Sequence, residues 1–194
     1  MLIEDGQGTG YTAGVNTENR LQTIAITSTV EHHINHKEGE SYSFITQQTP
    51  AYSDPSGASG DICFAYIKNT NSIDLCLEEI DIRLGGTSQA EIIKVLGNTT
   101  GTPIGGNTIT PVNLNLGSGK EADGTFRAGS EITEISGGTE LHRIYIGSSN
   151  TSETFNFGQD IIVPKNNIIT LWATNLNVEI DIVILFNYHS SASG

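Results

Sequence analysis

The chain has 194 residues, a length typical of one domain, and carries 22 acidic residues against 9 lysines and arginines, for a formal net charge of −13. Such an acidic surface repels the phosphates of nucleic acids and of anionic membranes, so neither is expected as a partner. Twenty-two glycines and a charged fraction of only 16% disfavour a helical bundle. The longest apolar run, residues 182–186, is far shorter than the roughly 20 residues of a membrane-spanning helix.

The beginning of the chain and its cysteines bear on the compartment in which it folds. Residues 1–10 contain neither the basic nor the apolar segment of a secretory signal, so signal-dependent export is not expected. Cys63 and Cys76 lie inside apolar strand patterns, which suits small buried side chains better than a disulfide. Two free thiols fit a chain that folds in a reducing cytosol.

The domain organisation follows from where hydrophobic periodicity begins. Residues 1–20 hold four glycines and almost no periodicity, so we expect an extended N-terminal arm there. Residues 21–30 then alternate, with Ile24, Ile26 and Val30 separated by polar residues, which predicts a half-buried strand. A single domain is expected over residues 21–190, followed by a short tail at residues 191–194.

The remaining pattern is a succession of strands. Further strands are predicted at residues 41–47, 62–68, 73–84, 91–96, 141–146, 154–164, 167–175 and 177–189. The polar turn at residues 69–72 predicts a β-hairpin, and the shifted spacing at Glu78 and Glu79 predicts a β-bulge. Segments rich in Gly, Pro and Ser predict long loops at residues 49–61, 97–108 and 117–130.

No segment keeps apolar residues at helical spacing over ten residues, so the expected fold class is all-β. With about nine or ten strands, the expected architecture is an antiparallel β-sandwich of two sheets in a jelly-roll arrangement. The sequence contains no internal repeat that would favour a propeller or a solenoid.

One cluster of metal-ligand type occurs in the chain. His32, His33 and His36 lie within five residues of one another, in a polar segment rich in glutamate. Imidazoles at such spacing can hold a transition metal when a helix or a tight knuckle fixes them. Because this segment predicts neither, a solvated loop is favoured, and no metal or other cofactor is expected.

Catalytic signatures are missing from the sequence. No nucleophile elbow, zinc-protease motif, phosphate-binding loop or paired-cysteine motif is present, so an enzyme is not expected. Glu78, Glu79 and Asp81 are assigned to the solvent-facing side of a strand rather than to a pair of catalytic carboxylates. His142 and His189 are expected as ordinary histidines at strand ends, and Trp172 as a core or interface side chain. These residues are therefore given no catalytic role.

Three segments resemble structural proteins of tailed-bacteriophage virions. They are GTGYTAGVNTENRL at residues 8–21, TPVNLNLGSG at residues 110–119 and ISGGTELHRIYI at residues 135–146. The resemblance implies a non-enzymatic β-sandwich component of the particle: a capsid decoration or auxiliary protein, a head-fibre base or a tail-associated protein. It implies assembly in the cytoplasm of the bacterial host.

The same resemblance implies how the protein would assemble. The arm would lie across a neighbouring virion protein, a major capsid, head or tail protein, and become ordered on assembly. The residues implied as partner contacts are Tyr11, Val15, Asn16, Asn19 and Leu21. The sandwich would form a homo-oligomer, with a trimer as one form, through its apolar strand faces.

A carbohydrate-binding or receptor-binding module is the alternative function. In that case the loops expected at residues 49–61, 97–108 and 117–130 would gather at one end of the sandwich as a recognition surface. A third class, a metal-dependent enzyme, would require the histidines at residues 32–36 to bind metal in stoichiometric amounts.

Deletion of residues 1–20 is expected to abolish incorporation into the particle while leaving a folded domain, because the arm provides contacts to a neighbour and no core. Incorporation is measured by the amount of protein in purified particles, and folding by the cooperativity of thermal unfolding. Normal incorporation of the truncated chain would contradict the role of the arm.

Overall fold

The computed structural model describes residues 2–4, 12–14, 40–48, 61–85, 91–147, 152–174 and 179–189. The chain divides into two compact units, Met1–His33 and Ile34–Gly194. In the first unit, strands β1 (Leu2–Glu4) and β2 (Thr12–Gly14) form an antiparallel pair with Leu2 opposite Gly14. The strand predicted at residues 21–30 and the tail at residues 191–194 lie outside the described residues.

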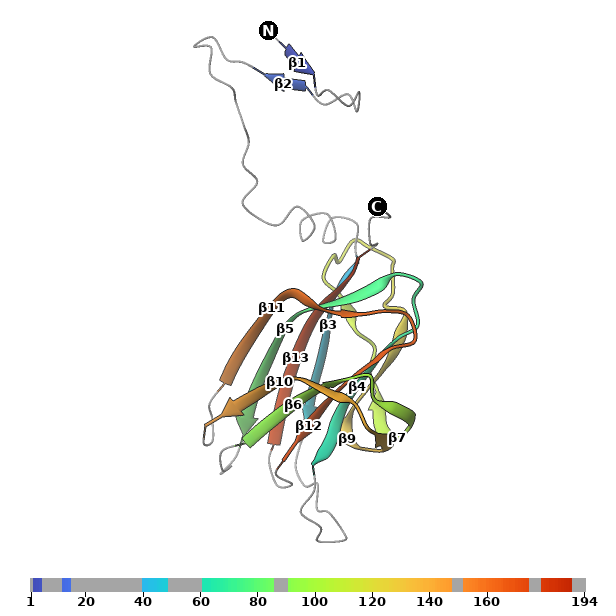
Figure 1. The fold of residues 1–194 in the computed structure, drawn as a ribbon, viewed down its shortest axis with the longest axis vertical. Coiled ribbons are helices and arrows are strands. Elements are labelled where there is room, and N and C mark those ends of the chain that lie inside the picture. The colour runs from blue at the N-terminus through green and yellow to red at the C-terminus, as the bar shows by residue number, and fades with distance from the viewer. Residues whose placement is uncertain are drawn as a thin grey trace. The chain divides into compact units, whose positions relative to one another are not determined.

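Two antiparallel sheets form the second unit, and none of its described residues is helical (Figure 1). The five-stranded sheet has the order β11 (Ser152–Val163), β5 (Asp74–Gly85), β13 (Glu179–His189), β3 (Ser41–Gln48) and β8 (Val112–Asn113). The six-stranded sheet has the order β10 (Thr139–Ile146), β6 (Glu91–Gly97), β12 (Ile168–Ala173), β4 (Ile62–Asn69), β9 (Gly124–Ser136) and β7 (Thr100–Thr108). The predicted all-β, antiparallel, sandwich-like fold is confirmed.

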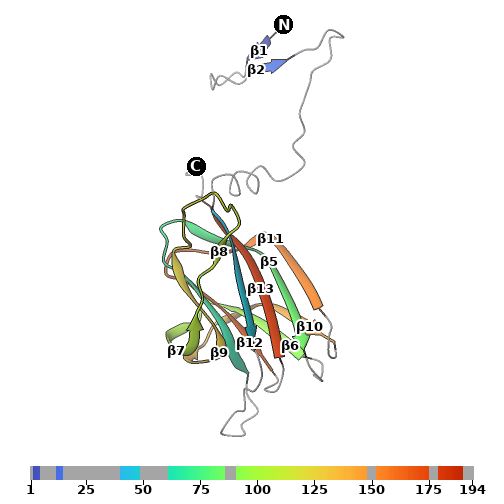
Figure 2. The same ribbon diagram turned by 180° about the vertical axis from the view of Figure 1, so that it is seen from behind.

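The strands pair in a nested order. The first strand of the second unit, β3, pairs with the last, β13, and then β4 pairs with β12, β5 with β11 and β6 with β10. Consecutive strands alternate between the sheets in both halves of this series, while β7, β8 and β9 are inserted between the halves. Figure 2 shows β3, β13, β5 and β11 side by side in the five-stranded sheet.

The core between the sheets is built mainly from alternate residues of the strands that face one another. On β13, Ile180, Ile182 and Ile184 are buried in it, and Phe186 continues the same face toward the end of the strand. At that end the rings of Phe186 and Phe126 stack with centroids 5.4 Å apart. This inward face accounts for the apolar alternation from which the strands were predicted.

The β-hairpin predicted at residues 69–72 is wrong, because β4 and β5 belong to different sheets. The turn instead carries the chain from one sheet to the other. The buried amide of Asn69 donates to the carbonyl oxygens of Ile73, at 2.9 Å, and Val163, at 2.8 Å. Its Oδ1 accepts from the backbone N–H of Asn71. Polar turn residues occur both in hairpins within one sheet and in connections between two sheets, so the sequence did not distinguish these two structures.

The bulge predicted at Glu78 and Glu79 is confirmed. Leu185 of β13 lies opposite Glu79, and the next residue, Phe186, lies opposite Leu77, so that Glu78 is the extra residue of β5. The extra residue restores the inward direction of the apolar residues on both sides of it.

A two-stranded ribbon packs on part of the outer face of the six-stranded sheet, over β4 and β12. Strand β9 pairs with β4 through residues 124–128 and with β7 further along. Its Ile132 and Ile135 join a second, smaller apolar cluster on the face of the sheet opposite the main core, with Cys63, Tyr66 and Ile168. Gly105 has a positive φ, and a Cβ there would collide with the carbonyl oxygen of Glu131, so the ribbon requires glycine at this position.

This ribbon corrects two of the predicted loops. Residues 100–108 form β7, and residues 124–136 form β9, so only part of the segments 97–108 and 117–130 is irregular. Glycine, proline and asparagine are depleted in strands, and they are frequent in β7. The ribbon is instead stabilised by Ile132 and Ile135 on the sheet below, a tertiary contact that local periodicity does not report.

Replacement Asn69→Ala is expected to lower the free energy of unfolding by about 2 to 4 kcal/mol, because two buried carbonyl oxygens and one N–H lose their partner. The measurement is urea denaturation followed by circular dichroism. Ser72→Ala, at an exposed position of the same turn, is the matched control and should change stability by no more than about 0.5 kcal/mol. Equal losses of stability in the two variants would show that the hydrogen bonds of the Asn69 amide do not stabilise the crossover between the sheets.

Candidate functional site

Several residues proposed from the sequence lie outside the described residues. These are the arm residues Tyr11, Val15, Asn16, Asn19 and Leu21, and the histidines His32, His33 and His36. Their roles as partner contacts or as weak candidates for a metal site stay predictions. Within the described ranges, no three His, Cys, Asp or Glu side chains are placed to hold a metal ion.

The two histidines in the described region are placed differently from one another. His189 ends β13, as predicted, whereas His142 lies inside β10, so its predicted position at a strand end is wrong. The half-buried ring of His142 packs 5.6 Å from the ring of Phe155 and 5.3 Å from that of Phe157. The side chain thus helps to close the edge between the two sheets.

Trp172 is half-buried and packs against the second apolar cluster, as predicted. Its indole Nε1 donates to Oγ1 of Thr170 at 2.8 Å. Tyr145, by contrast, is exposed on the edge strand β10. Both aromatic side chains belong to the six-stranded sheet.

Glu78 was assigned to the solvent-facing side of β5, and this is wrong. The bulge turns the carboxyl group beneath its neighbours, where Oε1 accepts from Nδ2 of Asn187 at 2.6 Å and from Nε2 of Gln159 at 3.3 Å. Because the amides fix this carboxylate in a buried site between β11 and β13, its contacts are those of a structural group.

The two cysteines are free and buried, as predicted. Burial raises the pKa of the Cys63 thiol to about 12, so the sulfur stays protonated at neutral pH. A thiolate is the nucleophilic form of cysteine, and the environment of Cys63 opposes it.

An apolar strip is exposed at the β3–β8 edge of the five-stranded sheet. We define it as Ile45, Val112, Leu114 and Leu116. Val112 pairs with Ser43, two residues from Ile45 on β3, and Leu114 donates its backbone N–H to the carbonyl oxygen of Ser41. Leu116 is 91% exposed. Clustered apolar side chains on a soluble surface mark an interaction site more often than single ones do.

Hydrogen bonds fix the loop that presents Leu116. Oδ1 of Asn113 accepts from the N–H of Asn115 at 2.8 Å, and Oδ1 of Asn115 accepts from the N–H of Gly117 at 3.1 Å. Lys120 Nζ forms an ion pair with Glu40, at 2.7 Å, which ties the loop to the start of β3. The apolar residue is therefore displayed on an ordered support, which lowers the entropic cost of docking it.

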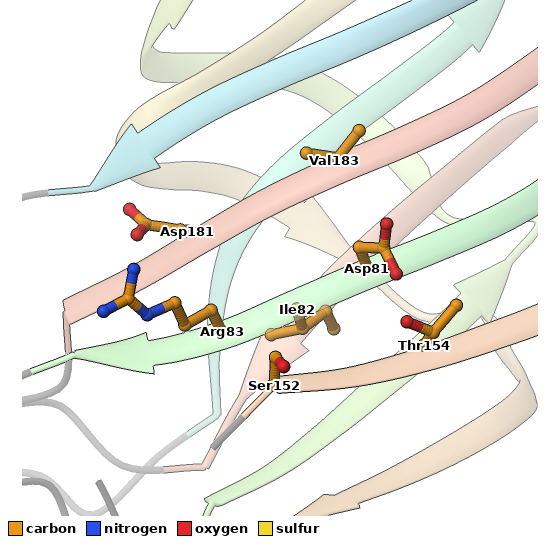
Figure 3. A pocket seen from close by; sticks show the side chains of 7 residues that line it. All are labelled: Asp81, Ile82, Arg83, Ser152, Thr154, Asp181 and Val183. Atoms are coloured by element: carbon orange, nitrogen blue, oxygen red, sulfur yellow. The ribbon is translucent and has the colours of Figure 1, made fainter. Parts of the chain in front are cut away.

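A polar depression of about 370 Å³ lies on the outer face of the same sheet, on the strands β11, β5 and β13. Figure 3 shows its side chains, which are Asp81, Ile82, Arg83, Ser152, Thr154, Asp181 and Val183. The register places them in two rows: Thr154, Asp81 and Val183 lie side by side, and Ser152, Arg83 and Asp181 form the next row.

The charged groups of this depression do not neutralise one another by direct contact. Arg83 and Asp181 are opposite residues on neighbouring strands, yet among the described residues neither forms an ion pair with the other. Oδ1 of Asp181 is buried and accepts no hydrogen bond from the described part of the chain. A buried carboxylate oxygen usually has a partner, and the described part of the chain provides none here.

The sequence indicated that the side chains of the depression face outward, but not that they lie together. The alternation on β5 and β13 places Asp81, Arg83 and Asp181 on outward-facing positions, but only the pairing of β5 with β13 brings them together. The paired residues Arg83 and Asp181 are 98 positions apart in the sequence, and local patterns contain no information on such pairings.

Comparison with known proteins does not assign the chain to a family: no family model matches the sequence, and no curated protein matches it. The described residues include no helix of the length and apolarity needed to cross a membrane.

Leu116→Asp is expected to change the free energy of unfolding by no more than about 0.5 kcal/mol, because the side chain contributes almost no buried surface. Leu77→Ala, in the core, should instead cost about 2 to 5 kcal/mol. Both values come from urea denaturation of the purified variants. A large loss of stability in Leu116→Asp would show that Leu116 is a folding residue rather than part of a docking surface.

Proposed function

We propose that the protein is a non-enzymatic structural component of a tailed-phage virion. We interpret the nested strand pairs as a jelly roll, an arrangement that viral capsid domains and lectins share. The proposal also draws on the three virion-like segments, of which residues 110–119 include most of the apolar strip.

The observation that carries the assembly role is the apolar strip on its ordered loop. The side chains of Ile45 and Val112 are 57% and 53% exposed, and Leu116 is almost fully exposed. Exposure of four large apolar side chains along one sheet edge costs solubility unless a partner covers them. A neighbouring virion protein or a second copy would bury them, so we propose this strip as an assembly surface.

The arm would supply a second contact. Residues 1–20 would bind a major capsid protein or another head or tail protein, and the strip would mediate a homo-oligomer such as a trimer. Assembly would take place in the cytoplasm of the bacterial host. This pair of contacts would suit a decoration, a fibre-base or a tail-associated position.

Light scattering on the untagged full chain over a concentration series tests the strip. The wild-type chain should form a trimer or a larger ring, and Leu116→Asp should shift the mass toward the monomer because a carboxylate would be buried in the contact. Ile104→Asp is the control, since Ile104 is 60% exposed on β7, outside the strip. A wild-type chain that is monomeric at every concentration would contradict self-association through the strip.

The location is tested separately. Antiserum against the protein should label purified tailed particles from a virus stock that encodes the chain, in electron micrographs and in gels of those particles. Signal in the infected-cell lysate without signal in the particles would overturn the virion assignment.

A carbohydrate-binding or receptor-binding module is the second candidate function. The polar depression on β5, β11 and β13 favours it, because carboxylate, guanidinium and hydroxyl groups converge there on rigid strands. Lectin domains share the jelly-roll arrangement, so this function fits the same interpretation of the fold.

A further inference from the structure

The polar depression combines hydrogen-bond donors with acceptors on exposed and half-buried side chains. The guanidinium of Arg83 offers donors only, the carboxylates of Asp81 and Asp181 offer acceptors only, and the hydroxyls of Ser152 and Thr154 can do both. Within the described residues, the three charged side chains have no hydrogen bonds or ion pairs among themselves. A ligand that satisfies them must itself carry both kinds of group.

The charges narrow the class of ligand. An anion would meet two carboxylates on a protein whose net charge is −13, and a cation, although the carboxylates attract it, would leave the donors of Arg83 without an acceptor. A neutral polyol meets neither penalty: its hydroxyl hydrogens can be accepted by Asp81 and Asp181, and its oxygens can accept from Arg83. Hydrogen bonds to charged groups are also stronger than those between neutral groups.

The support of the site is rigid. All seven lining residues belong to strands, and β5 lies between β11 and β13 with continuous pairing at these positions. Ile82, on the floor, is buried in the main core, which fixes the backbone beneath the depression. Sites built on strands hold their polar groups in place more accurately than sites on loops.

The position of the depression also suits recognition. The second unit is entered at β3 and left at β13, and Ser41 and Asn187 are paired at that end of the sheet. Asp181 is six residues from Asn187 on β13, about 20 Å along the strand. The depression therefore lies toward the end of β13 opposite to the pair of Ser41 with Asn187.

From these observations we infer that the depression lined by Asp81, Arg83, Ser152, Thr154 and Asp181 is a binding site for a neutral saccharide. Hydroxyl groups of one sugar residue are bound by the two carboxylates and the guanidinium, and Val183 contacts an apolar face of the ring. This gives the alternative function a site and its ligand class, and it does not depend on the virion role. Among the described residues no aromatic ring lines the depression, so millimolar affinity for a single sugar is expected.

Saturation-transfer NMR on the full chain tests this inference. The probes are the methyl glycosides of glucose, galactose, mannose and N-acetylglucosamine, with lysine methyl ester and inorganic phosphate as charged probes. At least one neutral glycoside should bind, whereas the charged probes should not. Preferential binding of lysine methyl ester would show a site for basic peptides, and preferential binding of phosphate an anion site; either result would overturn the inference. So would the absence of binding by all four glycosides at about 50 mM, well above a millimolar dissociation constant.

Two variants locate the binding. Asp181→Asn keeps the shape of the side chain and should weaken the glycoside about tenfold or more, as should Arg83→Ala, because each removes a charged hydrogen-bonding group. Asp160→Asn is the matched control, on an exposed position of β11 outside the depression, and should bind as the wild type does. Thermal unfolding verifies that all three variants fold. Wild-type affinity in both Asp181→Asn and Arg83→Ala would place the sugar elsewhere and leave the apolar strip and its assembly role untouched.

Discussion

The two sheets bury their apolar inner faces against one another. Consecutive strands alternate between the sheets, so neither sheet can form from one continuous stretch of the chain. Strands β3 and β13 are separated by most of the second unit yet pair along eight positions. The apolar inner residues of β5 and β13 therefore stabilise a set of long-range pairings together. The crossover at Asn69, the bulge at Glu78 and the positions of both surface features all depend on this arrangement.

The outer faces of the two sheets differ in how far the chain itself covers them. On the six-stranded sheet, Ile132 and Ile135 of β9 pack on Tyr66 and Cys63, so this part of the face is covered by the chain itself. On the five-stranded sheet, the apolar strip and the polar depression lie at the β3–β8 edge and on β5, β11 and β13. Both proposed functions, assembly and recognition, therefore lie on the five-stranded sheet and not on the sheet that carries the ribbon.

Local patterns were sufficient for the fold class and for most strands of the second unit, because Ile180, Ile182 and Ile184 repeat the two-residue period of a strand with one buried face. They failed where the decisive contact was distant. The turn after Asn69 resembles that of a hairpin, and only the bond to Val163, 94 residues away, identifies it as a crossover. The depression was missed for the same reason, since Arg83 and Asp181 meet only through strand pairing.

The pairing of β3 with β13 has a mechanical consequence. Hydrogen bonds in an antiparallel pair run perpendicular to the strands. A pull on both strands from the end at Ser41 and Asn187 would break these bonds one after another. A load applied between the start of β3 and a ligand held near Asp181 would run along the strands and act on the eight paired positions at once. A domain that is held at the start of β3 and pulled through a ligand near Asp181 is therefore loaded in the direction in which the strand pair is stronger.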